Sequence, residues 1–254
     1  MLLAIDIGNT NITLGVYGDE HLLFTARLAT DRRRTADQYA IEINDVMRLF
    51  GYESAEIEDA IICSVVPTVG SAVSSAVSKL CDIVPLQLGP GVRTGLNIKI
   101  DDPAQLGADL AAGAVAALAE YNMPCVIIDL GTATTVSVLD KNGCFLGGSI
   151  AAGVGLTLRA LCENTAQLPS ININAPRSVI GTNTVDCMKS GLVFGTAAMI
   201  DGLVDRISDS LGERPTVVAT GGLSREIIEH CKTDIIYNEN LLLDGLFEIY
   251  NRNK

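Results

Sequence analysis

Two short stretches of the sequence combine an aspartate, a glycine and hydroxyl-bearing residues in the order that a phosphate-binding turn needs. The first, residues 6–10, reads Asp-Ile-Gly-Asn-Thr, and the second, residues 129–135, reads Asp-Leu-Gly-Thr-Ala-Thr-Thr. Each follows an apolar run and precedes another extended run, which predicts a strand ending in an acid, a tight turn and a returning strand. Glycine amides and hydroxyls can hold phosphate oxygens, and carboxylates can hold a hydrated cation. Two such turns in separate halves of one chain indicate a phosphoryl-transfer enzyme.

Transfer of a γ-phosphoryl group also requires a carboxylate that takes the proton of the acceptor hydroxyl. Asp109 is the best candidate, because it stands at the start of an expected helix, directly after an irregular loop. An acid at this position can alternatively serve only to complement the helix dipole. A third glycine turn, residues 220–222 (Thr-Gly-Gly), lies between an expected strand and an expected helix, where the backbone can approach adenine or ribose closely.

Composition and missing motifs exclude several other classes of protein. The 254 residues contain no G-x-x-x-x-G-K-[ST] and no G-x-S-x-G, and the glycines at 89–91 and 153–155 do not complete a dinucleotide-binding fingerprint. A net charge of −12 argues against a nucleic-acid partner. Seven scattered cysteines without C-x-x-C spacing indicate a reducing compartment, and no signal peptide or long apolar stretch is evident. We therefore expect a cytoplasmic protein with no membrane partner.

The hydrophobic pattern predicts the elements that position these residues. We expect strands at about residues 2–7, 11–17, 22–28, 60–66, 83–88, 125–130, 133–140, 144–150 and 216–219. We expect helices at about residues 35–50, 71–80, 109–121, 154–165, 184–211 and 224–230. This order indicates an α/β duplication with an N-terminal half, 1–117, and a C-terminal half, 118–254. A ligand cleft is expected between the two halves.

The motifs occur together, and in the same order, in one known family. They comprise residues 6–10, 94–96, 107–109, 129–135, 147–150, 180–184 and 220–222. On these residues, the sequence resembles the type III pantothenate kinases of the acetate and sugar kinase/Hsp70/actin superfamily over essentially its whole length. The resemblance implies duplicated ribonuclease H-like (actin-like ATPase) domains and ATP-dependent phosphorylation of pantothenate, the first step of coenzyme A biosynthesis. It also implies a homodimer that uses Mg2+ and a monovalent cation, K+ or NH4+.

The same resemblance assigns roles to individual residues. The ATP phosphates would be wrapped by the first turn with its returning strand, and by one residue of the second turn: Asp6, Ile7, Gly8, Asn9, Thr10, Asn11, Ile12, Thr13 and Thr132. Asp6 would hold Mg2+ through water, and Asp129 would lie by the monovalent cation. Pantothenate would be bordered by Gly107, Ala108, Asp109 and Leu110, with Asp109 as general base, and Thr184 would reach it from the neighbouring subunit.

Three positions depart from the pattern of the family. Leu110 stands where an arginine is usual, Ile100 where a tyrosine is usual, and Ala152 where a proline is common. Leucine cannot make the charge-assisted contact that an arginine makes to an anionic substrate, although Arg93 or Lys99 in the preceding loop could supply the charge. Two alternatives therefore stand beside a pantothenate kinase. One is a non-catalytic regulatory or nucleotide-binding paralogue, and the other is a kinase for another small hydroxy acid.

Overall fold

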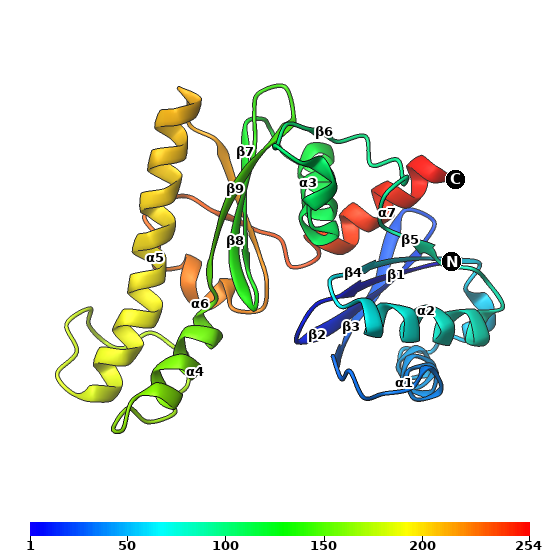
Figure 1. The fold of residues 1–254 in the computed structure, drawn as a ribbon, viewed down its shortest axis with the longest axis horizontal. Helices are drawn as coiled ribbons and strands as arrows, with labels where there is room; N and C mark the ends of the chain where they lie inside the picture. The colour runs from blue at the N-terminus through cyan, green and yellow to red at the C-terminus, as the bar shows by residue number, and fades with distance from the viewer. The chain divides into compact units, whose positions relative to one another are not determined.

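The computed structural model describes residues 1–254, and the contacts within the chain divide it into two units (Figure 1). Unit 1 comprises residues 1–96, 102–119 and 241–254, and unit 2 comprises residues 97–101 and 120–240. The halves expected from the sequence, 1–117 and 118–254, differ from this division chiefly at the C-terminus. Residues 241–254 belong to unit 1 because they form a helix that packs on its sheet.

The sheet of unit 1 has the strand order β3-β2-β1-β4-β5. Its strands are β1 (Leu2–Ile7), β2 (Asn11–Gly18), β3 (His21–Ala29), β4 (Asp59–Ser64) and β5 (Leu86–Gln87). The central strand β1 pairs antiparallel with β2 and parallel with β4. Side chains of β1 alternate between the two faces of the sheet, and the strand is buried on both faces except at Asp6, which is half-buried.

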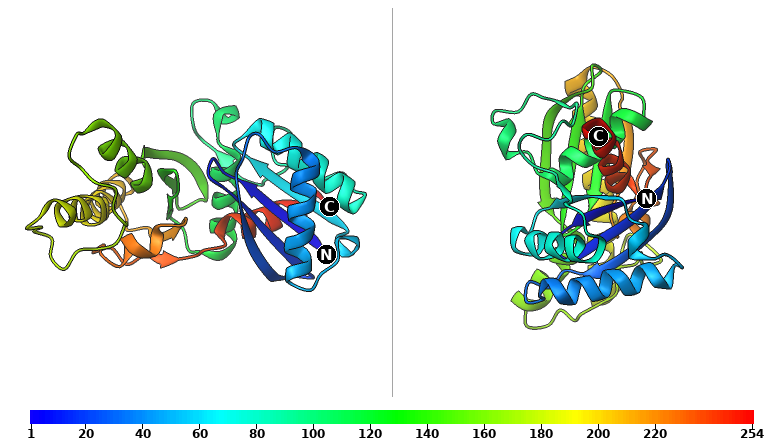
Figure 2. Two further views of the ribbon diagram at one scale, coloured as in Figure 1. Left: turned by 90° about the horizontal axis from the view of Figure 1, so that it is seen from below. Right: turned by 90° about the vertical axis from the view of Figure 1, so that its right-hand side faces the viewer.

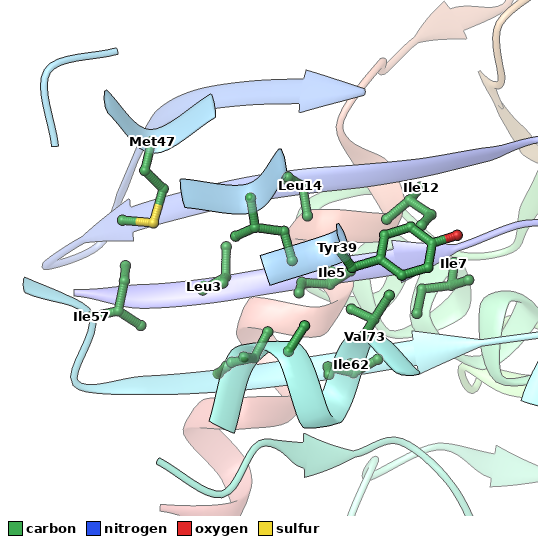
Figure 3. Packing of buried hydrophobic residues seen from close by; sticks show 14 of the residues in the cluster. Leu3, Ile5, Ile7, Ile12, Leu14, Tyr39, Met47, Ile57, Ile62 and Val73 are labelled. Carbon is green, nitrogen blue, oxygen red and sulfur yellow. The ribbon is translucent and has the colours of Figure 1, made fainter. Parts of the chain in front are cut away.

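Helices α1 (Ala36–Leu49) and α2 (Pro67–Cys81) cover one face of this sheet (Figure 2). Thr35 caps α1 as the sequence predicts: its hydroxyl accepts from the Gln38 N–H, and its own N–H donates to Gln38 Oε1 at 2.9 Å. Apolar side chains from the strands and both helices form one cluster around the fully buried Tyr39 (Figure 3). Burying each large aliphatic side chain there contributes about 1.5–3 kcal/mol.

Helices α3 (Ala108–Glu120) and α7 (Leu241–Asn253) pack on the other face of the same sheet. The cluster on this face joins Leu2 and Ala4 of β1 to Ala112 of α3 and Leu246 of α7. The two helices also touch directly, because Gly245 lies against the backbone of Ala112. Helix α7 was not among the elements expected from the sequence.

The sheet of unit 2 repeats the first sheet strand for strand. Its order is β11-β10-β7-β8-β9-β6, so that β7, β8, β9, β10 and β11 take the places of β1, β2, β3, β4 and β5. The strands are β7 (Cys125–Leu130), β8 (Ala133–Leu139), β9 (Cys144–Ala152), β10 (Thr216–Thr220), β11 (Ile236–Tyr237) and the added edge strand β6 (Asn97–Ile98). Strand β7 has the same burial pattern along its length as β1. The duplication predicted from the sequence is therefore present in the structure.

Three helices belong to unit 2: α4 (Val154–Asn164), α5 (Thr184–Leu211) and α6 (Ser224–Ile228). Helix α5 has the predicted bounds, and Asn183 caps it by accepting from the Asp186 N–H at 2.9 Å. By length and composition alone α5 could cross a membrane, with a window of mean hydropathy 1.3 that is 33% buried. Its buried side chains, among them Leu192, Ile200 and Val204, pack against β7, β8 and β10, which is typical of a core helix.

Candidate active site

The turn between β1 and β2 is held by backbone hydrogen bonds that leave its polar side chains exposed. The Gly8 N–H donates to the Asn11 carbonyl at 2.9 Å, and the Thr30 hydroxyl donates to the Gly8 carbonyl at 2.8 Å. The Thr30 N–H donates to the Thr10 carbonyl at 3.0 Å, so β3 fixes the turn from its other side. Asn9, Thr10 and Asn11 are exposed, whereas Ile7 and Ile12 lie in the core. Exposed hydroxyl and amide groups on a fixed turn can bind phosphate oxygens.

Asp6 lies at the end of β1, on the sheet face that carries α3 and α7. Its partner across β2 is Thr13, and its partner on β4 is Cys63. The Cys63 thiol is fully buried. Burial raises the pKa of this thiol well above its usual range, and the charges of Asp6 and Asp109 raise it further, as does a hydrogen bond to Asp6. Because both carboxylates act on one thiol, the expected Mg2+ ligand and the expected base gather at the same end of this face.

Asp109 stands in the first turn of α3, where Gly107 gives its carboxylate room. One Asp109 oxygen accepts from the Leu110 N–H at 2.8 Å. A Cβ on Gly107 would lie 2.5 Å from that same oxygen, Oδ1, so only glycine permits this position without displacing the carboxylate. Asp109 and Leu110 are both half-buried, as are Gly107 and Ala108. A half-buried carboxylate at a helix start keeps access to a substrate hydroxyl.

The turn between β7 and β8 repeats this arrangement in unit 2. Asp129 ends its strand and faces Thr135 across the hairpin, as Asp6 faces Thr13. The Gly131 N–H donates to the Ala133 carbonyl at 3.1 Å, and Thr132 at the tip is exposed. A Cβ on Gly153 would lie 2.3 Å from the Thr132 carbonyl oxygen, so the start of α4 packs directly on this turn.

The third glycine turn meets Asp129 within unit 2. Thr220 is the partner of Asp129 in the parallel pairing of β10 with β7. Gly221 has φ +100°, and a Cβ there would lie 2.5 Å from the Asp129 carboxylate. The side chain of Ser224 donates to the Thr220 carbonyl and holds the turn closed. Two of the motifs singled out in the sequence therefore lie together at the carboxyl ends of β7 and β10, as expected for open α/β sheets.

The oxygen donors at both acid-tipped turns suit hard cations. The chain contains no group of three or more His, Cys, Asp or Glu side chains that could hold a metal ion alone. Mg2+ keeps several waters and commonly takes one or two carboxylates together with substrate phosphates. The half-buried Asp6 can provide one such carboxylate. Asp129 likewise offers carboxylate oxygens, and the carbonyl oxygens of Gly131 and Thr132 in the same turn lie against Gly153.

The remaining predicted residues occupy different places. Thr184 is the first residue of α5 and is exposed. Lys99 forms an ion pair with Asp140 at 3.6 Å, and a hydrogen bond to Cys144, together with the charges of Cys144 and Asp140, raises the Lys99 pKa. Ile100 packs in unit 2, where its side chain lies 3.6 Å from the site of a Cβ on Gly147. Arg93 is exposed and forms no ion pair. Its N–H donates to Asn253 Oδ1 at 3.0 Å, and its carbonyl accepts from Asn253 Nδ2 at 2.9 Å.

Reasoning from the sequence missed two contributors to this site. The sequence pattern singles out neither Cys63 nor Thr30. Nothing local marks either residue, because Cys63 reaches the site through the pairing of β4 with β1, and Thr30 through a hydrogen bond from its hydroxyl to the Gly8 carbonyl. The signal that could have found Cys63 is its place next to the end of β4, since the carboxyl ends of parallel neighbours meet at one edge.

Comparison with known proteins places these features in a family. A family model described as type III pantothenate kinase matches residues 2–206. Type III pantothenate kinases of Exiguobacterium sibiricum and Halalkalibacterium halodurans are 44% and 40% identical over 100% of both chains. The activator of 2-hydroxyisocaproyl-CoA dehydratase from Clostridium difficile, solved with bound ADPNP, has a TM-score of 0.59 at 17% identity, covering 99% of this chain and 95% of its own. The two sheets and this likeness identify the duplicated ribonuclease H-like, actin-like ATPase fold.

Proposed function

The chain belongs to the type III pantothenate kinase family, and we propose that Asp109 is the general base of its reaction. The protein is an enzyme that uses ATP to phosphorylate pantothenate to 4′-phosphopantothenate, the first step of coenzyme A biosynthesis. The role of Asp109 is supported by its place in the first turn of α3, which packs on the sheet face that carries Asp6, and by the buried Cys63 thiol, whose pKa the charges of both carboxylates raise. The base and the carboxylate that serves the phosphates thus lie at one end of one sheet face.

Asp109 takes the proton of the acceptor hydroxyl as that oxygen attacks the γ-phosphorus of ATP. The bond between the γ-phosphorus and the bridging oxygen of ADP breaks as the new bond forms, and ADP leaves. Gly107, Ala108 and Leu110 border the acceptor. The absence of a side chain at Gly107 leaves space for the Asp109 carboxylate in its present orientation. Most of the rate enhancement comes from positioning and from stabilisation of charge, as in other phosphoryl transfers.

The first turn, in unit 1, and Thr132, in unit 2, each offer donors for the ATP phosphates. The backbone amides and side chains of residues 6–13 supply donors, and the exposed Thr10 and Thr132 hydroxyls occupy equivalent tips in the two units. Asp6 would hold Mg2+ through water, and the bound ion would neutralise charge on the phosphates. Asp129 would lie by the monovalent cation, K+ or NH4+, and would supply a carboxylate oxygen to it.

The acceptor's carboxylate needs a partner other than residue 110, because Leu110 carries no charge. Of the two basic residues that could serve, Lys99 is engaged with Asp140, whereas the Arg93 guanidinium forms no ion pair. Arg93 is therefore the better candidate.

A panel of small hydroxy acids tests the alternative that Leu110 alters the acceptor. If another acid is phosphorylated in preference to pantothenate, that acid is the substrate.

A homodimer completes the acceptor site through Thr184. Residues near Thr184 carry large exposed apolar side chains, with Ile180 at 76% and Val179 at 63% exposure. The segment that carries them is fixed against α5, because the Ser190 hydroxyl donates to the Val179 carbonyl at 2.5 Å and a Cβ on Gly181 would lie 2.4 Å from the Cys187 nitrogen. A fixed apolar surface of this kind suits a second copy of the chain.

The seven free thiols suit a cytoplasmic location.

The decisive experiment replaces Asp109 by Asn and measures ATP consumption with pantothenate at saturating ATP, Mg2+ and K+. We expect turnover to fall by about two to four orders of magnitude while the melting temperature and ATP binding stay near those of the wild type. Asp209→Asn, an exposed position on α5, is the matched control and should leave turnover unchanged. Equal turnover of Asp109→Asn and wild type would remove Asp109 from the mechanism. A wild type without turnover would favour the non-catalytic paralogue.

A further inference from the structure

We propose that Cys63 is a positioning residue: its thiol donates a hydrogen bond to the Asp6 carboxylate and holds Asp6 toward the phosphate-binding turn. The inference rests on the proposed function, since that function assigns Asp6 its role. Cys63 itself touches no substrate. It acts through Asp6, on the affinity for the nucleotide with its metal ion.

The fold leaves the Cys63 side chain no other direction. Cys63 is paired with Asp6 in the parallel register of β4 and β1, so the two side chains leave the sheet side by side on one face. The Cys63 side chain is fully buried and belongs to the cluster that includes Ala112 and Val115 of α3. Solvent is thus excluded from the thiol, and Asp6 is the polar side chain that lies beside it on the neighbouring strand.

The surroundings favour donation from the thiol to Asp6. Cys63 is enclosed by apolar side chains of the cluster that includes Ala4, Ala112 and Val115, and the side chain beside it on β1 is that of Asp6. A thiol has a polar hydrogen to donate, and a carboxylate oxygen is an acceptor for it.

Unit 2 places a donor at the equivalent position. Thr220 of β10 is paired with Asp129 of β7 as Cys63 of β4 is paired with Asp6 of β1, and the Thr220 side chain is also buried, at 2% exposure. Both strand-ending acids therefore have a side chain with a polar hydrogen as their neighbour on the parallel strand. The buried Cys125 differs, because burial alone raises its pKa to about 12 and no carboxylate contributes.

The first experiment measures binding of ATP with Mg2+ by calorimetry, without pantothenate, for Cys63→Ala, Cys63→Ser and the control Cys125→Ala. We expect Cys63→Ala to weaken binding by about three- to tenfold, because a hydrogen bond to a charged group is lost, and Cys63→Ser to restore it. Cys125→Ala should lower the melting temperature by a similar amount without changing affinity, because it deletes an equally buried thiol. Unchanged affinity in Cys63→Ala, or a loss that Cys63→Ser does not restore, would overturn the proposal.

The second experiment observes the thiol itself and is independent of turnover. The S–H stretching band that disappears from the Raman spectrum in Cys63→Ser should lie at lower frequency than the band lost in Cys125→Ser, because a hydrogen bond to a carboxylate weakens the S–H bond. Addition of ATP with Mg2+ should shift the Cys63 band alone. A Cys63 band at the frequency of a free thiol contradicts the inference even if the enzyme is active. A shifted band in a protein that does not phosphorylate pantothenate would instead retain the inference and reject the proposed function.

Discussion

Single residues decide where the reactive carboxylates point. Asp6 and Asp129 hold equivalent positions in β1 and β7, yet each is set by different neighbours: Thr13 and Cys63 for the first, Thr135 and Thr220 for the second. Asp109 instead depends on a missing side chain, that of Gly107. Mutation of a glycine that is needed to place a carboxylate tests catalysis, whereas mutation of a glycine that is needed only for a turn tests stability.

Gly107→Ala should damage catalysis more than stability. The added Cβ would lie 2.5 Å from Asp109 Oδ1, and the flexible carboxylate can rotate away, so the fold tolerates the change while the base loses its direction. We expect kcat to fall by about 100-fold, since small misplacement of a catalytic group has costs of this order. Gly89→Ala, shortly after β5, is the control, because a Cβ there meets no atom within 4 Å. Equal kinetics of the two variants, with ATP binding intact in both, would contradict the placement of Asp109.

At the scale of elements, the helix that carries Asp109 is held by the last helix of the chain. Helix α3 is rich in alanine and glycine, and its Ala112 backbone touches Gly245 of α7. On the other side α7 packs on β1 and β4, with Leu243 and Leu246 in the shared cluster. The Tyr17 hydroxyl adds a hydrogen bond to Asp244 at 2.9 Å. Helix α7 therefore fixes the position of α3 over the sheet.

Gly245→Ala should separate these two helices and destabilise unit 1. Its Cβ would lie 1.9 Å from the Ala112 carbonyl oxygen and 2.6 Å from the carbonyl carbon, and backbone atoms cannot move aside as a side chain can. We expect the free energy of unfolding to fall by about 3 kcal/mol, the upper part of the range for overpacking. Gly155→Ala in α4, where a Cβ meets nothing within 4 Å, should instead be neutral or raise stability by up to about 1 kcal/mol. Urea unfolding of both variants measures the difference, and equal stabilities would show that α3 and α7 are not in close contact.

At the scale of the whole molecule, the chain is a duplication, and the proposed acceptor site needs one residue, Thr184, from a second copy of the chain. Units 1 and 2 share the strand order 3-2-1-4-5, and each places an acid at the end of its central strand. The proposal assigns the contact between the two copies to unit 2, to Thr184 and the apolar residues before it. The proposed dimer explains why these apolar side chains are exposed in the single chain.

Ile180→Glu should dissociate the dimer and impair the acceptor site together. Ile180 is 76% exposed, so a charge there costs the single chain little, whereas burial of the same charge between two copies is expensive. We expect the mass measured by light scattering to fall from twice 26.8 kDa to 26.8 kDa, with a raised KM for pantothenate. Ile41→Glu on α1, at 62% exposure, is the matched control and should change neither. A wild type that is already monomeric, or a variant that remains dimeric, would exclude this surface as the interface.

Most of the individual elements could be predicted from the sequence because their signals are local. The alternation and burial of β1 and β7, the caps of α1 and α5, and the two acid-tipped turns are all determined by residues within a few positions of one another. Some boundaries differ from the prediction. Helix α2 begins at Pro67 rather than at residue 71, because proline suits the first turn of a helix, and the strand expected at 83–88 is reduced to β5.

Only the tertiary structure decided which distant residues meet. The assignment of α7 to unit 1, the pairing of β6 with β9 and the neighbourhood of Cys63, Asp6 and Asp109 all join residues that are far apart in the sequence. Periodicity reports which face of an element is buried, but it does not report what covers that face. The sequence alone therefore determined the chemistry available at each strand end, and the packing of α3 and α7 on β1 and β4 determined which of those groups act together.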